Sequence, residues 1–499
     1  MEEQPYMSPE TTSRARISPI TIKPEMKIKT LSDQDVANIH QATLTVLNET
    51  GVRFPSEKAL KIFAEAGADV DFKSQTVKIQ PDLLMENLAL APRQFTMGSR
   101  GDRDLDVVLD GHKTYCGTAG TGTQTIDPVT GNRRPSTKND IAMMALISDY
   151  LPSISFYWPM VAAQDCPVQS IALHELEASF ANTQKHVQIV SCVNQKSASY
   201  AVEMAKIIAG NSQQLKTRPP LSLIASPISP LANDQGVIDA ALVFAEAGLP
   251  VGFAAMPVLG STAPASIAGT LVLGNAEILS SVCLLQLVNP GTPVFYPLFS
   301  AMMNPFTGGI LVSTQIQHLF YAATVQLGHY YNLPVMSSFG GSDLQHPGSW
   351  SVGRSDAIDA FFVCATGPDM LPSFGLLEAY TLLYPEKLLF DNEIFLAVKS
   401  MAAGLSIDTD TLAVDEIMAV GPGGHFLDRD FTFRNIRKLW QPGITRDWSA
   451  ENQDFRDPLE TAAEKTRWIL DNHKPKPLDS EAANELQRII RSAEDGLTS

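Results

Sequence analysis

The segment Phe339–Trp350, FGGSDLQHPGSW, gathers residue types that are able to form a binding site. It holds three glycines, one carboxylate, one imidazole and two aromatic rings within twelve residues. Glycine allows the backbone to approach a ligand closely. Asp343 could orient His346, and His346 could donate a hydrogen bond to a substrate carboxylate. We predict Asp343 and His346 as catalytic residues and Gly340 and Gly341 as substrate contacts.

Aromatic side chains supply most of the other candidates. Several apolar runs end in aromatic, hydroxyl and amide side chains with few charges. Such a lining suits a cation without an N–H group, namely a quaternary ammonium held by cation–π attraction. The further predicted substrate-binding residues are Phe95, Trp158, Phe295, Tyr296, Phe339, Trp350 and Glu378. The alternative for any single aromatic residue is core packing, and for the 339–350 segment it is a surface loop whose Ser349 or Ser351 caps a helix.

Three further motifs favour structural roles. The glycine-rich segment 117–123, GTAGTGT, lacks the strand, spacing and following helix of a dinucleotide site, so we interpret it as a structural turn or loop. The stretch His174–Glu177 resembles a set of metal ligands only superficially, and we interpret it as an exposed helix face. Cys192 and Cys364 have no nearby histidine, which favours small core side chains. We predict no metal site.

Apolar runs that alternate with longer amphipathic stretches would position these residues. From about residue 150 there are eight such runs: SISFYWPM, HVQIVSC, LSLIASP, PVGFAAMP, PVFYPLFS, PVMSSFGG, MLPSFG and KLLFDNE. Continuous apolar strands separated by helices are typical of parallel βαβ units, and eight of them predict an α/β fold with a closed (β/α)8 TIM barrel. A doubly wound open sheet is the alternative. In a barrel, catalysis belongs at the carboxyl ends of the strands.

The pattern divides the chain into four parts. We predict an N-terminal arm (1–30), an α+β segment packed on the barrel (31–148), the barrel core (149–400) and a C-terminal helical extension (401–499). Ser32, an acidic first turn and apolar periodicity up to Gly51 predict a helix. The other elements predicted outside the barrel are helices near 56–67 and 81–90, strands near 95–97 and 106–109, and a charged tail helix over 457–495.

Composition narrows the functional class. The 54 acidic and 37 basic residues give a formal charge of −17, which argues against a nucleic-acid partner. Five scattered cysteines without a C-x-x-C pair indicate neither a disulfide framework nor a structural zinc site. The acidic N-terminus has no apolar signal region, and no stretch reaches the ~18 apolar residues of a membrane span. We therefore expect a soluble cytoplasmic protein without a membrane partner.

Four motifs together make the chain similar to a known family. They are Pro92-x-x-Phe95 with Gly98-x-Arg100; Asp127-x-x-Thr130-Gly-x-Arg-Arg-Pro-Ser136 with Asp140; Leu333-Pro followed by Gly340-Gly-Ser-Asp343; and Gly421-x-Gly-Gly-His-Phe. With these motifs the chain resembles the trimethylamine methyltransferase (MttB) family, the B components of corrinoid-dependent methyl transfer systems, over essentially its full length. The resemblance implies a (β/α)8 barrel whose carboxyl-end cavity receives a methylamine and faces a separate corrinoid protein.

The chain departs from the archaeal trimethylamine enzymes of that family in one respect. Those enzymes place a pyrrolysine close to the position of Phe339–Ser342, where this chain has ordinary residues. A quaternary ammonium leaves as a neutral amine when Co(I) attacks one of its methyl carbons, so no residue is needed to activate the nitrogen. Members without pyrrolysine resemble glycine betaine methyltransferases and relatives that use proline betaine, carnitine or similar amines.

The resemblance therefore predicts a methyltransferase that moves a methyl group from glycine betaine or a related quaternary amine to the Co(I) of a corrinoid. A cognate corrinoid protein would supply the corrinoid (cobalamin), with none tightly bound by this chain, and we expect a homo-oligomer. One alternative is a non-catalytic amine-binding barrel, and another is a methyltransferase acting on proline betaine, carnitine or trimethylamine. A pyridoxal phosphate or flavin barrel is a further alternative, although no lysine stands at the predicted strand ends to form a Schiff base.

Overall fold

The computed structural model describes residues 19–23, 27–312, 314–339, 346–439, 443–449 and 451–496. Most of the predicted N-terminal arm lies outside these residues. The predicted site residues Gly340, Gly341 and Asp343 also lie outside them.

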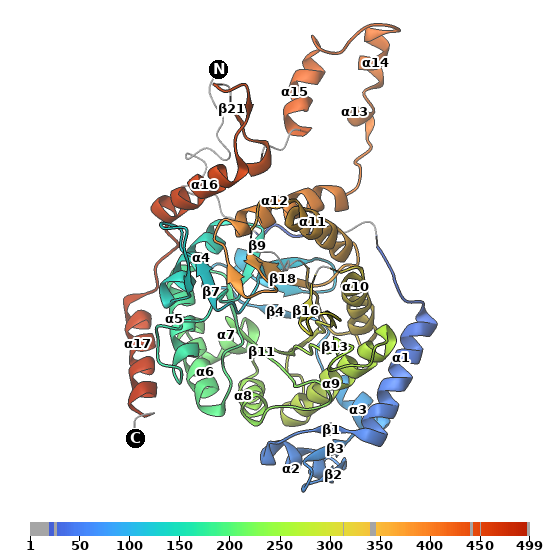
Figure 1. The fold of residues 1–499 in the computed structure, drawn as a ribbon, viewed down its shortest axis with the longest axis vertical. Helices are drawn as coiled ribbons and strands as arrows, with labels where there is room; N and C mark the ends of the chain where they lie inside the picture. Colours follow the sequence, from blue (N-terminus) through green and yellow to red (C-terminus); the bar gives the residue numbers. More distant parts are fainter. Residues whose placement is uncertain are drawn as a thin grey trace.

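Eight parallel strands form a closed barrel, which confirms the predicted fold class (Figure 1). In chain order they are β6 (Tyr115–Thr118), β9 (Ile154–Tyr157), β10 (His186–Ile189), β11 (Leu221–Ala225), β12 (Val251–Phe253), β14 (Val294–Pro297), β17 (Val335–Met336) and β18 (Met370–Phe374). β6 pairs with both β18 and β9, and this closes the ring. Every residue of the eight strands is buried, so they appear in the sequence as continuous apolar runs.

Helices surround the barrel, as Figure 1 shows. They are α4 (Lys138–Tyr150), α5 (Ile171–Asn182), α6 (Gln195–Ala209), α7 (Ser212–Thr217), α8 (Gln235–Glu246), α9 (Ile267–Val288), α10 (Gln315–Tyr330), α11 (Trp350–Cys364) and α12 (Lys387–Ala402). α9 is long and apolar enough to cross a membrane by length and composition, but 83% of its most apolar window is buried inside the protein. A core helix passes the same test, so α9 is weak evidence for a membrane span.

The structure corrects the identity of one predicted strand. The run KLLFDNE is not a strand, because it forms the first two turns of α12. The barrel strand missing from the predicted set is β6, which lies within residues 31–148 and carries the sequence YCGT. A short apolar run does not distinguish a strand from a buried helix, and a glycine-containing strand of four residues gives little strand signal.

The N-terminal helices pack on α9 in the helix layer, and the hairpin that follows them closes the amino end of the barrel. Ser32 and Asp35 form a capping box on α1 (Asp33–Thr45), and a π-helical turn, η2 (Val46–Thr50), leads to Gly51. The elements that follow are β1 (Val52–Arg53), α2 (Glu57–Glu65), β2 (Asp69–Asp71), β3 (Thr76–Lys78), α3 (Pro81–Leu88), β4 (Phe95–Met97), η3 (Arg103–Leu105) and β5 (Val107–Leu109). After β4, the backbone N–H of Gly98 donates to Pro219 O at 2.8 Å, just before β11. The β4–β5 hairpin therefore covers the end of the barrel where the strands begin.

Two small sheets cover the opposite, carboxyl end. One consists of β13 (Val258–Leu259), β15 (Ala301–Met303) and β16 (Ile310–Leu311). The other consists of β19 (Leu376–Leu377), β20 (Leu382–Leu383), β7 (Gln124–Ile126) and β8 (Arg133–Pro135). All these strands belong to segments that follow a barrel strand, so the loops at this end are built into a structured rim.

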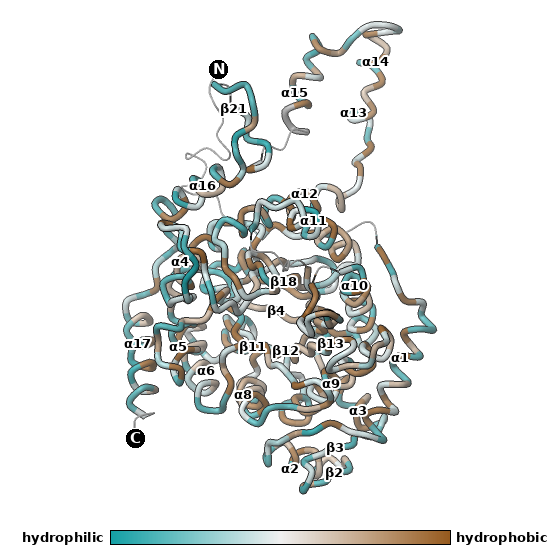
Figure 2. The backbone as a smooth tube through the Cα atoms, in the orientation of Figure 1, coloured by the Kyte–Doolittle hydropathy of each residue, from teal (hydrophilic) through white to brown (hydrophobic). Residues whose placement is uncertain are grey.

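The C-terminal extension begins with an arm that projects from the barrel in Figure 1. We call residues 403–439 the arm; it contains α13 (Thr409–Leu412), α14 (Val414–Val420) and α15 (Asp430–Leu439). Figure 2 shows hydrophobic residues along these helices. The chain then returns through η4 (Ile444–Arg446), β21 (Trp448–Ser449) and β22 (Asp454–Phe455). The predicted tail helix is two helices, α16 (Pro458–Asn472) and α17 (Ser480–Asp495), because Pro475 and Pro477 stand between them.

Candidate active site

A cavity of about 320 Å³ opens at the carboxyl end of the barrel. Its walls come from the segments after β6, β9, β12, β14, β17 and β18 and from α10. The lining residues are Ala119, Gly120, Thr121, Trp158, Met256, Val258, Phe299, Ala301, Ile310, Val312, Gln317, Tyr321, Ser338, Pro372, Ser373, Ala379, Tyr380 and Thr381. Four of these side chains are aromatic, and none of them carries a charge. Within the described part of the chain, the cavity is therefore a neutral, partly aromatic pocket.

The cavity has a buried floor and an open mouth. Trp158, Tyr321, Ser338 and Ser373 are each less than a tenth exposed and form the floor. Met256 and Ile310 are 49% and 53% exposed and mark the mouth. A ligand would therefore enter past apolar side chains and reach aromatic and hydroxyl groups.

Gly120 allows the Trp158 ring to lie against the loop after β6. A Cβ atom at position 120 would overlap Nε1 and Cδ1 of the indole and the Pro159 carbonyl oxygen. Any larger residue would displace the ring or the loop. The segment that we interpreted as a structural turn thus contributes Ala119, Gly120 and Thr121 to the cavity wall.

Four hydroxyl groups meet on one side of the floor, and we call Tyr321, Ser338, Ser373 and Tyr380 the hydroxyl cluster. Ser338 Oγ contacts Ser373 Oγ closely and lies 3.2 Å from the Tyr380 hydroxyl. Gln317 Nε2 donates to the Tyr321 hydroxyl at 2.6 Å. Burial raises the pKa of Tyr380 to about 12 and raises the pKa of Tyr321 as well. Both phenols therefore keep their protons at neutral pH and remain able to donate hydrogen bonds.

The backbone that carries two of these hydroxyl groups is strained. Ser373 has a φ of 127°, and Glu378, Ala379 and Tyr380 have φ values of 48°, 51° and 69°. The strand register also shifts between Leu371 and Phe374. Non-glycine residues in such conformations cost about 1–3 kcal/mol each and concentrate at functional sites. The surrounding structure must therefore hold this segment in place.

A buried ion cluster fastens the strained segment to the helix layer. Asp391 Oδ2 accepts a hydrogen bond of 2.7 Å from the backbone N–H of Gly375, two residues after Ser373. Asp391 also pairs with Lys387, whose Nζ lies 2.8 Å from Asp356 Oδ2 on α11. Burial lowers the pKa of Lys387, but Asp356 and Asp391 outweigh that effect and raise it overall. Lys387 therefore stays charged between two carboxylates.

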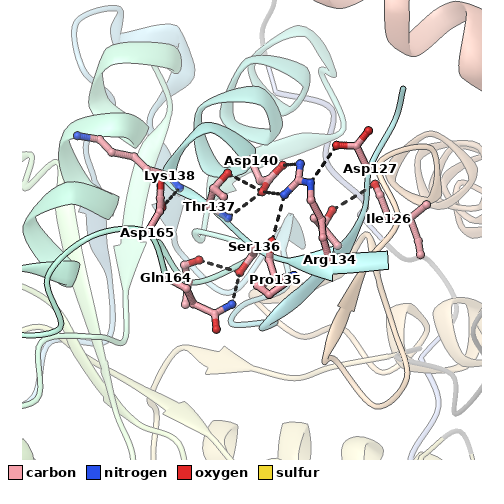
Figure 3. Close-up of polar contacts among 12 residues, drawn as sticks. Ile126, Asp127, Arg134, Pro135, Ser136, Thr137, Lys138, Asp140, Gln164 and Asp165 are labelled. Atoms are coloured by element: carbon pink, nitrogen blue, oxygen red, sulfur yellow. Dashed lines mark hydrogen bonds and ion pairs between the residues drawn. The ribbon is translucent and has the colours of Figure 1, made fainter. Parts of the chain in front are cut away.

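A second polar network braces the segments after β6 and β9, which supply Thr121 and Trp158 to the cavity wall. Figure 3 shows its contacts. The Arg134 guanidinium donates to both carboxylate oxygens of Asp140, at 2.7 and 2.8 Å, and to Asp127 at 2.9 Å. Gln164 donates to Ser136, and the Ser136 hydroxyl donates to Ala162 O at 2.8 Å. These contacts join the β7–β8 hairpin, the start of α4 and the loop after β9. They give the Asp127–Asp140 motif a structural role beside the cavity wall.

The structure brings Trp158, among the predicted site residues, into the cavity wall. Glu378 lies next to the lining residue Ala379, but its carboxylate pairs with Arg133 at 2.9 Å. Phe95 lies on β4, at the amino end of the barrel, so it does not reach this cavity. Glu378 and Phe95 therefore do not line the cavity.

Barrel geometry separates the two predicted residues of β14. Phe295 packs against Gly252 inside the barrel, below the cavity. Tyr296 points outward, and its hydroxyl donates to Asn275 Oδ1 on α9 at 2.8 Å. Successive side chains of a strand face opposite sides, so these neighbours could not both face the cavity.

The last predicted residues belong to the segment that ends at α11. The Phe339 ring packs against Phe374 with 5.1 Å between centroids and is buried among helix-layer side chains. Trp350 begins α11 and is 82% exposed, and Ser349 caps that helix, as the alternative interpretation expects. His346 is exposed, with its ring 6.4 Å from that of Tyr384. Among the residues described, this segment adds no side chain to the cavity lining.

Sequence reasoning missed most of the lining. Phe299 and Tyr380 lie in the segments after β14 and β18, close in sequence to predicted site residues. The alternation of side chains along a strand is the signal that could have identified Phe299. Tyr321 lies on α10, where its aromatic side chain gave no sign of facing a cavity. The His174–Glu177 stretch is also corrected, because Glu175 is only 1% exposed and accepts a hydrogen bond from Ser191.

Comparison with known proteins gives consistent matches over the whole chain. A model of the family described as "Trimethylamine methyltransferase (MTTB)" matches residues 6–497. The trimethylamine methyltransferase MttB of Desulfitobacterium hafniense strain DCB-2 is 31% identical over 469 residues, which cover 93% of this chain and 94% of that protein. The glycine betaine methyltransferase of D. hafniense strain Y51 is also 31% identical, over 93% of this chain and 97% of its own.

Matches at lower identity include an enzyme and a solved structure from Methanosarcina barkeri. The trimethylamine methyltransferase MttB of Methanosarcina barkeri strain Fusaro is 28% identical over 94% of this chain and 96% of its own. The crystal structure of the monomethylamine methyltransferase MtmB of M. barkeri aligns with a TM-score of 0.47 at 12% identity, covering 91% of this chain and 97% of that one.

Proposed function

We propose, since the chain belongs to the trimethylamine methyltransferase family, that it moves a methyl group from a quaternary amine to a corrinoid carried by a separate protein. The family matches support methyl transfer from an amine. The choice of a quaternary amine rests on one observation, which is the neutral, aromatic cavity at the carboxyl end of the barrel.

The lining matches the needs of a permanent cation. A quaternary ammonium has no N–H group, so it forms no N–H hydrogen bond to carboxylate or carbonyl acceptors. The rings of Trp158, Phe299, Tyr321 and Tyr380 present π faces or edges to the cavity. Each suitable cation–π contact contributes about 0.5–2 kcal/mol, more when the cation is desolvated. No lining side chain among those described carries a positive charge that would repel the ligand.

The residues act mainly by positioning and by excluding water. Attack on a methyl carbon breaks its C–N bond, and the electron pair stays on nitrogen, which leaves as a neutral tertiary amine. No proton has to be delivered, which agrees with the absence of charged lining residues in the described part of the chain. The corrinoid supplies the Co(I) nucleophile that accepts the methyl group. Alignment of a bound methyl group with the mouth, in a site shielded from water, accounts for the rate enhancement.

The surface around the mouth supports docking of a partner protein. Large apolar side chains are exposed on loops that follow five barrel strands: Val168 (80%), Val193 (53%), Ile228 (53%), Met256 (49%), Phe306 (95%) and Ile310 (53%). Exposed apolar groups gathered around a cavity mark an interaction surface. A corrinoid protein that covers this rim would bring its cofactor to the cavity mouth.

Purified protein mixed with free cob(I)alamin and a panel of amines tests the proposal. We expect methylcobalamin to form with quaternary amines and not with trimethylamine, followed by its absorbance change. The variant Trp158→Leu should raise KM for the amine about tenfold, because it removes a π face. Trp448→Leu, on the distant β21–β22 hairpin, is the matched control. Transfer from trimethylamine alone, or from no amine, would overturn the proposal.

A further inference from the structure

We infer that the hydroxyl cluster on the cavity floor binds an oxygen atom on the tail of the substrate. The substrate class would then be a quaternary amine whose tail bears an acceptor oxygen, such as a carboxylate or a hydroxyl group. This inference rests on the proposed function and deepens it, because it assigns substrate specificity to Tyr321, Ser338, Ser373 and Tyr380.

The first step is the orientation of the substrate in the cavity. A methyl acceptor carried by another protein reaches the cavity through the mouth, which Met256 and Ile310 border. The reacting methyl group must therefore face the mouth. The part of the substrate that does not react then lies toward the floor, where Tyr321 is 2% exposed, Ser338 6% and Ser373 5%. The tail thus meets the hydroxyl cluster.

The second step is the chemistry that the floor offers. Among the described lining residues there is no lysine, arginine or histidine, so this part of the lining offers only neutral donors to an oxygen on the tail. Two oxygens of the cluster lie within hydrogen-bond distance of Ser338 Oγ: Ser373 Oγ in close contact and the Tyr380 hydroxyl at 3.2 Å. The Tyr380 hydroxyl also donates to Phe339 O at 3.2 Å. Hydroxyl hydrogens rotate, so the cluster is able to turn several donors toward one acceptor. A purely hydrocarbon tail would leave these groups facing an apolar surface.

The third step is the backbone that holds the cluster. Ser373 and Tyr380 both have positive φ values, 127° and 69°, that non-glycine residues seldom adopt. Ser373 lies on β18 and Tyr380 lies in the turn between β19 and β20, yet their side chains converge on Ser338. The hydrogen bond from Gly375 N–H to the buried Asp391 fixes the segment between them. The fold therefore maintains an unfavourable backbone in the region that places two hydroxyl groups on the floor.

The size of the cavity limits the tail. Its volume of about 320 Å³ lies near the lower end of the range for small-molecule pockets, about 300–1,000 Å³. A trimethylammonium head already occupies part of this space. The acceptor oxygen therefore stands within a few bonds of the nitrogen.

Substrate pairs that differ in the tail oxygen test the inference. Choline and propyltrimethylammonium have nearly the same shape, and only choline has the oxygen; glycine betaine provides a carboxylate. Methyl transfer to cob(I)alamin is measured for each with the wild type, Tyr380→Phe and Ser338→Ala. Both variants keep most of the cavity shape, and Tyr380→Phe keeps the aromatic ring. Tyr330→Phe is the control, since Tyr330 is 45% exposed at the end of α10.

We expect the two variants to lower kcat/KM about 10- to 100-fold for glycine betaine or about 3- to 10-fold for choline, according to which oxygen the cluster binds. The value for propyltrimethylammonium should change less than about twofold. The ratio between an oxygen-bearing substrate and propyltrimethylammonium does not depend on the fraction of folded enzyme, so partial unfolding cannot imitate the result. Tyr330→Phe should leave the ratio unchanged.

Two results would overturn the inference. One is a wild type that prefers propyltrimethylammonium or treats all three amines alike, and the other is variants that affect all three equally. If the wild type transfers no methyl group, the proposed function fails. The affinities of the same amines, measured by calorimetry, then test the inference through the ratio between an oxygen-bearing amine and propyltrimethylammonium. Absence of any binding would overturn both.

Discussion

Single side chains decide whether the cavity can hold a cation. The lining has aromatic rings and no charge among the described residues, so attraction for a cation depends on weak contacts that a nearby charge can override. Met256 is half exposed at the mouth and provides a position where such a charge can be introduced without disturbing the floor.

Met256→Lys should raise KM for a quaternary amine about tenfold, because a positive charge several ångströms from the bound cation costs about 1–2 kcal/mol at a partly exposed site. Steady-state methyl transfer to cob(I)alamin at low salt measures the effect, which should shrink as ionic strength rises. Met401→Lys, at an exposed position on α12, is the control for added charge. An unchanged KM for Met256→Lys would place the bound amine elsewhere.

Glu175 provides a pH dependence of stability. Burial raises its pKa from the ordinary value of 4.5 to about 7, against hydrogen bonds from Ser191 and the Ala163 N–H that lower it. The folded state therefore keeps the proton that the unfolded state loses, and stability falls as pH rises from about 4.5 to about 7. The loss amounts to about 3 kcal/mol at 1.36 kcal/mol per unit.

Glu175→Gln should remove this part of the pH dependence while keeping a hydrogen-bonding side chain. Urea unfolding at several pH values between 4.5 and 7 measures the difference between variant and wild type, with Glu203→Gln on α6 as the control. Parallel stability curves for wild type and Glu175→Gln would show that the buried carboxyl group does not titrate in this range.

For single residues, the sequence indicates which residue types lie near the strand ends better than it predicts which way their side chains point. Trp158 follows directly on a buried strand, so both its position and its role near the strand end are readable. Tyr296 is also an aromatic residue near the end of a buried strand, yet its hydroxyl donates to Asn275 in the helix layer. Only the alternation of side chains along β14 separates the two cases, and a strand of four residues leaves its phase uncertain until its partners are known.

Among the elements, the segment after β18 has the most strained backbone. The end of β18 and this segment together contain four non-glycine residues with positive φ and supply Ser373 and Tyr380 to the floor. Lys387, Asp356 and Asp391 fasten it, and each of the three side chains is at most 3% exposed. Removal of one partner from a buried ion cluster leaves an uncompensated charge behind.

Lys387→Met should destabilise the protein by about 3–5 kcal/mol, because two buried carboxylates lose their cation. Denaturant unfolding measures this loss. Lys399→Met, on the same helix but partly exposed, should change stability by less than about 0.5 kcal/mol. A small effect at position 387 would mean that Asp356 or Asp391 is neutral in the folded protein.

Element prediction succeeded where local signals are strong. The capping box at Ser32 and Asp35 fixed the start of α1, and fully buried strands gave most of the barrel runs. It failed at β6 and at the start of α12, because the short segments there show neither helical nor strand periodicity clearly. The small sheets over the carboxyl end depend on contacts between distant segments, such as β20 with β7, and local patterns hold no information about such pairings.

For the whole molecule, the arm is the clearest sign of a partner. Ten large apolar side chains on it are between 43% and 91% exposed: Leu405, Ile407, Leu412, Val414, Ile417, Met418, Phe426, Leu427, Phe433 and Ile436. Helices of 4, 7 and 10 residues are marginal without tertiary packing. The prediction of a homo-oligomer stands, and the arm is the surface on which we expect a second copy to pack.

Light scattering coupled to gel filtration tests this prediction. The wild type should elute with the mass of at least two chains, and Leu405→Asp combined with Met418→Asp should lower the mass or weaken association at least tenfold. A control with two aspartates at polar exposed positions, Ser406→Asp and Thr409→Asp, should not. A wild type that runs as a single chain would contradict the prediction.

In the described part of the chain, the β4–β5 hairpin and the packed barrel interior close the amino end, which leaves the mouth at the carboxyl end as the entrance to the cavity. Under the proposed function, the methyl acceptor arrives at the same mouth through which the amine enters and the demethylated product departs. The amine must then bind first, and the product stays trapped until the acceptor protein dissociates. Kinetics should follow a compulsory order, in which a high concentration of the acceptor protein competes with scarce amine and slows turnover.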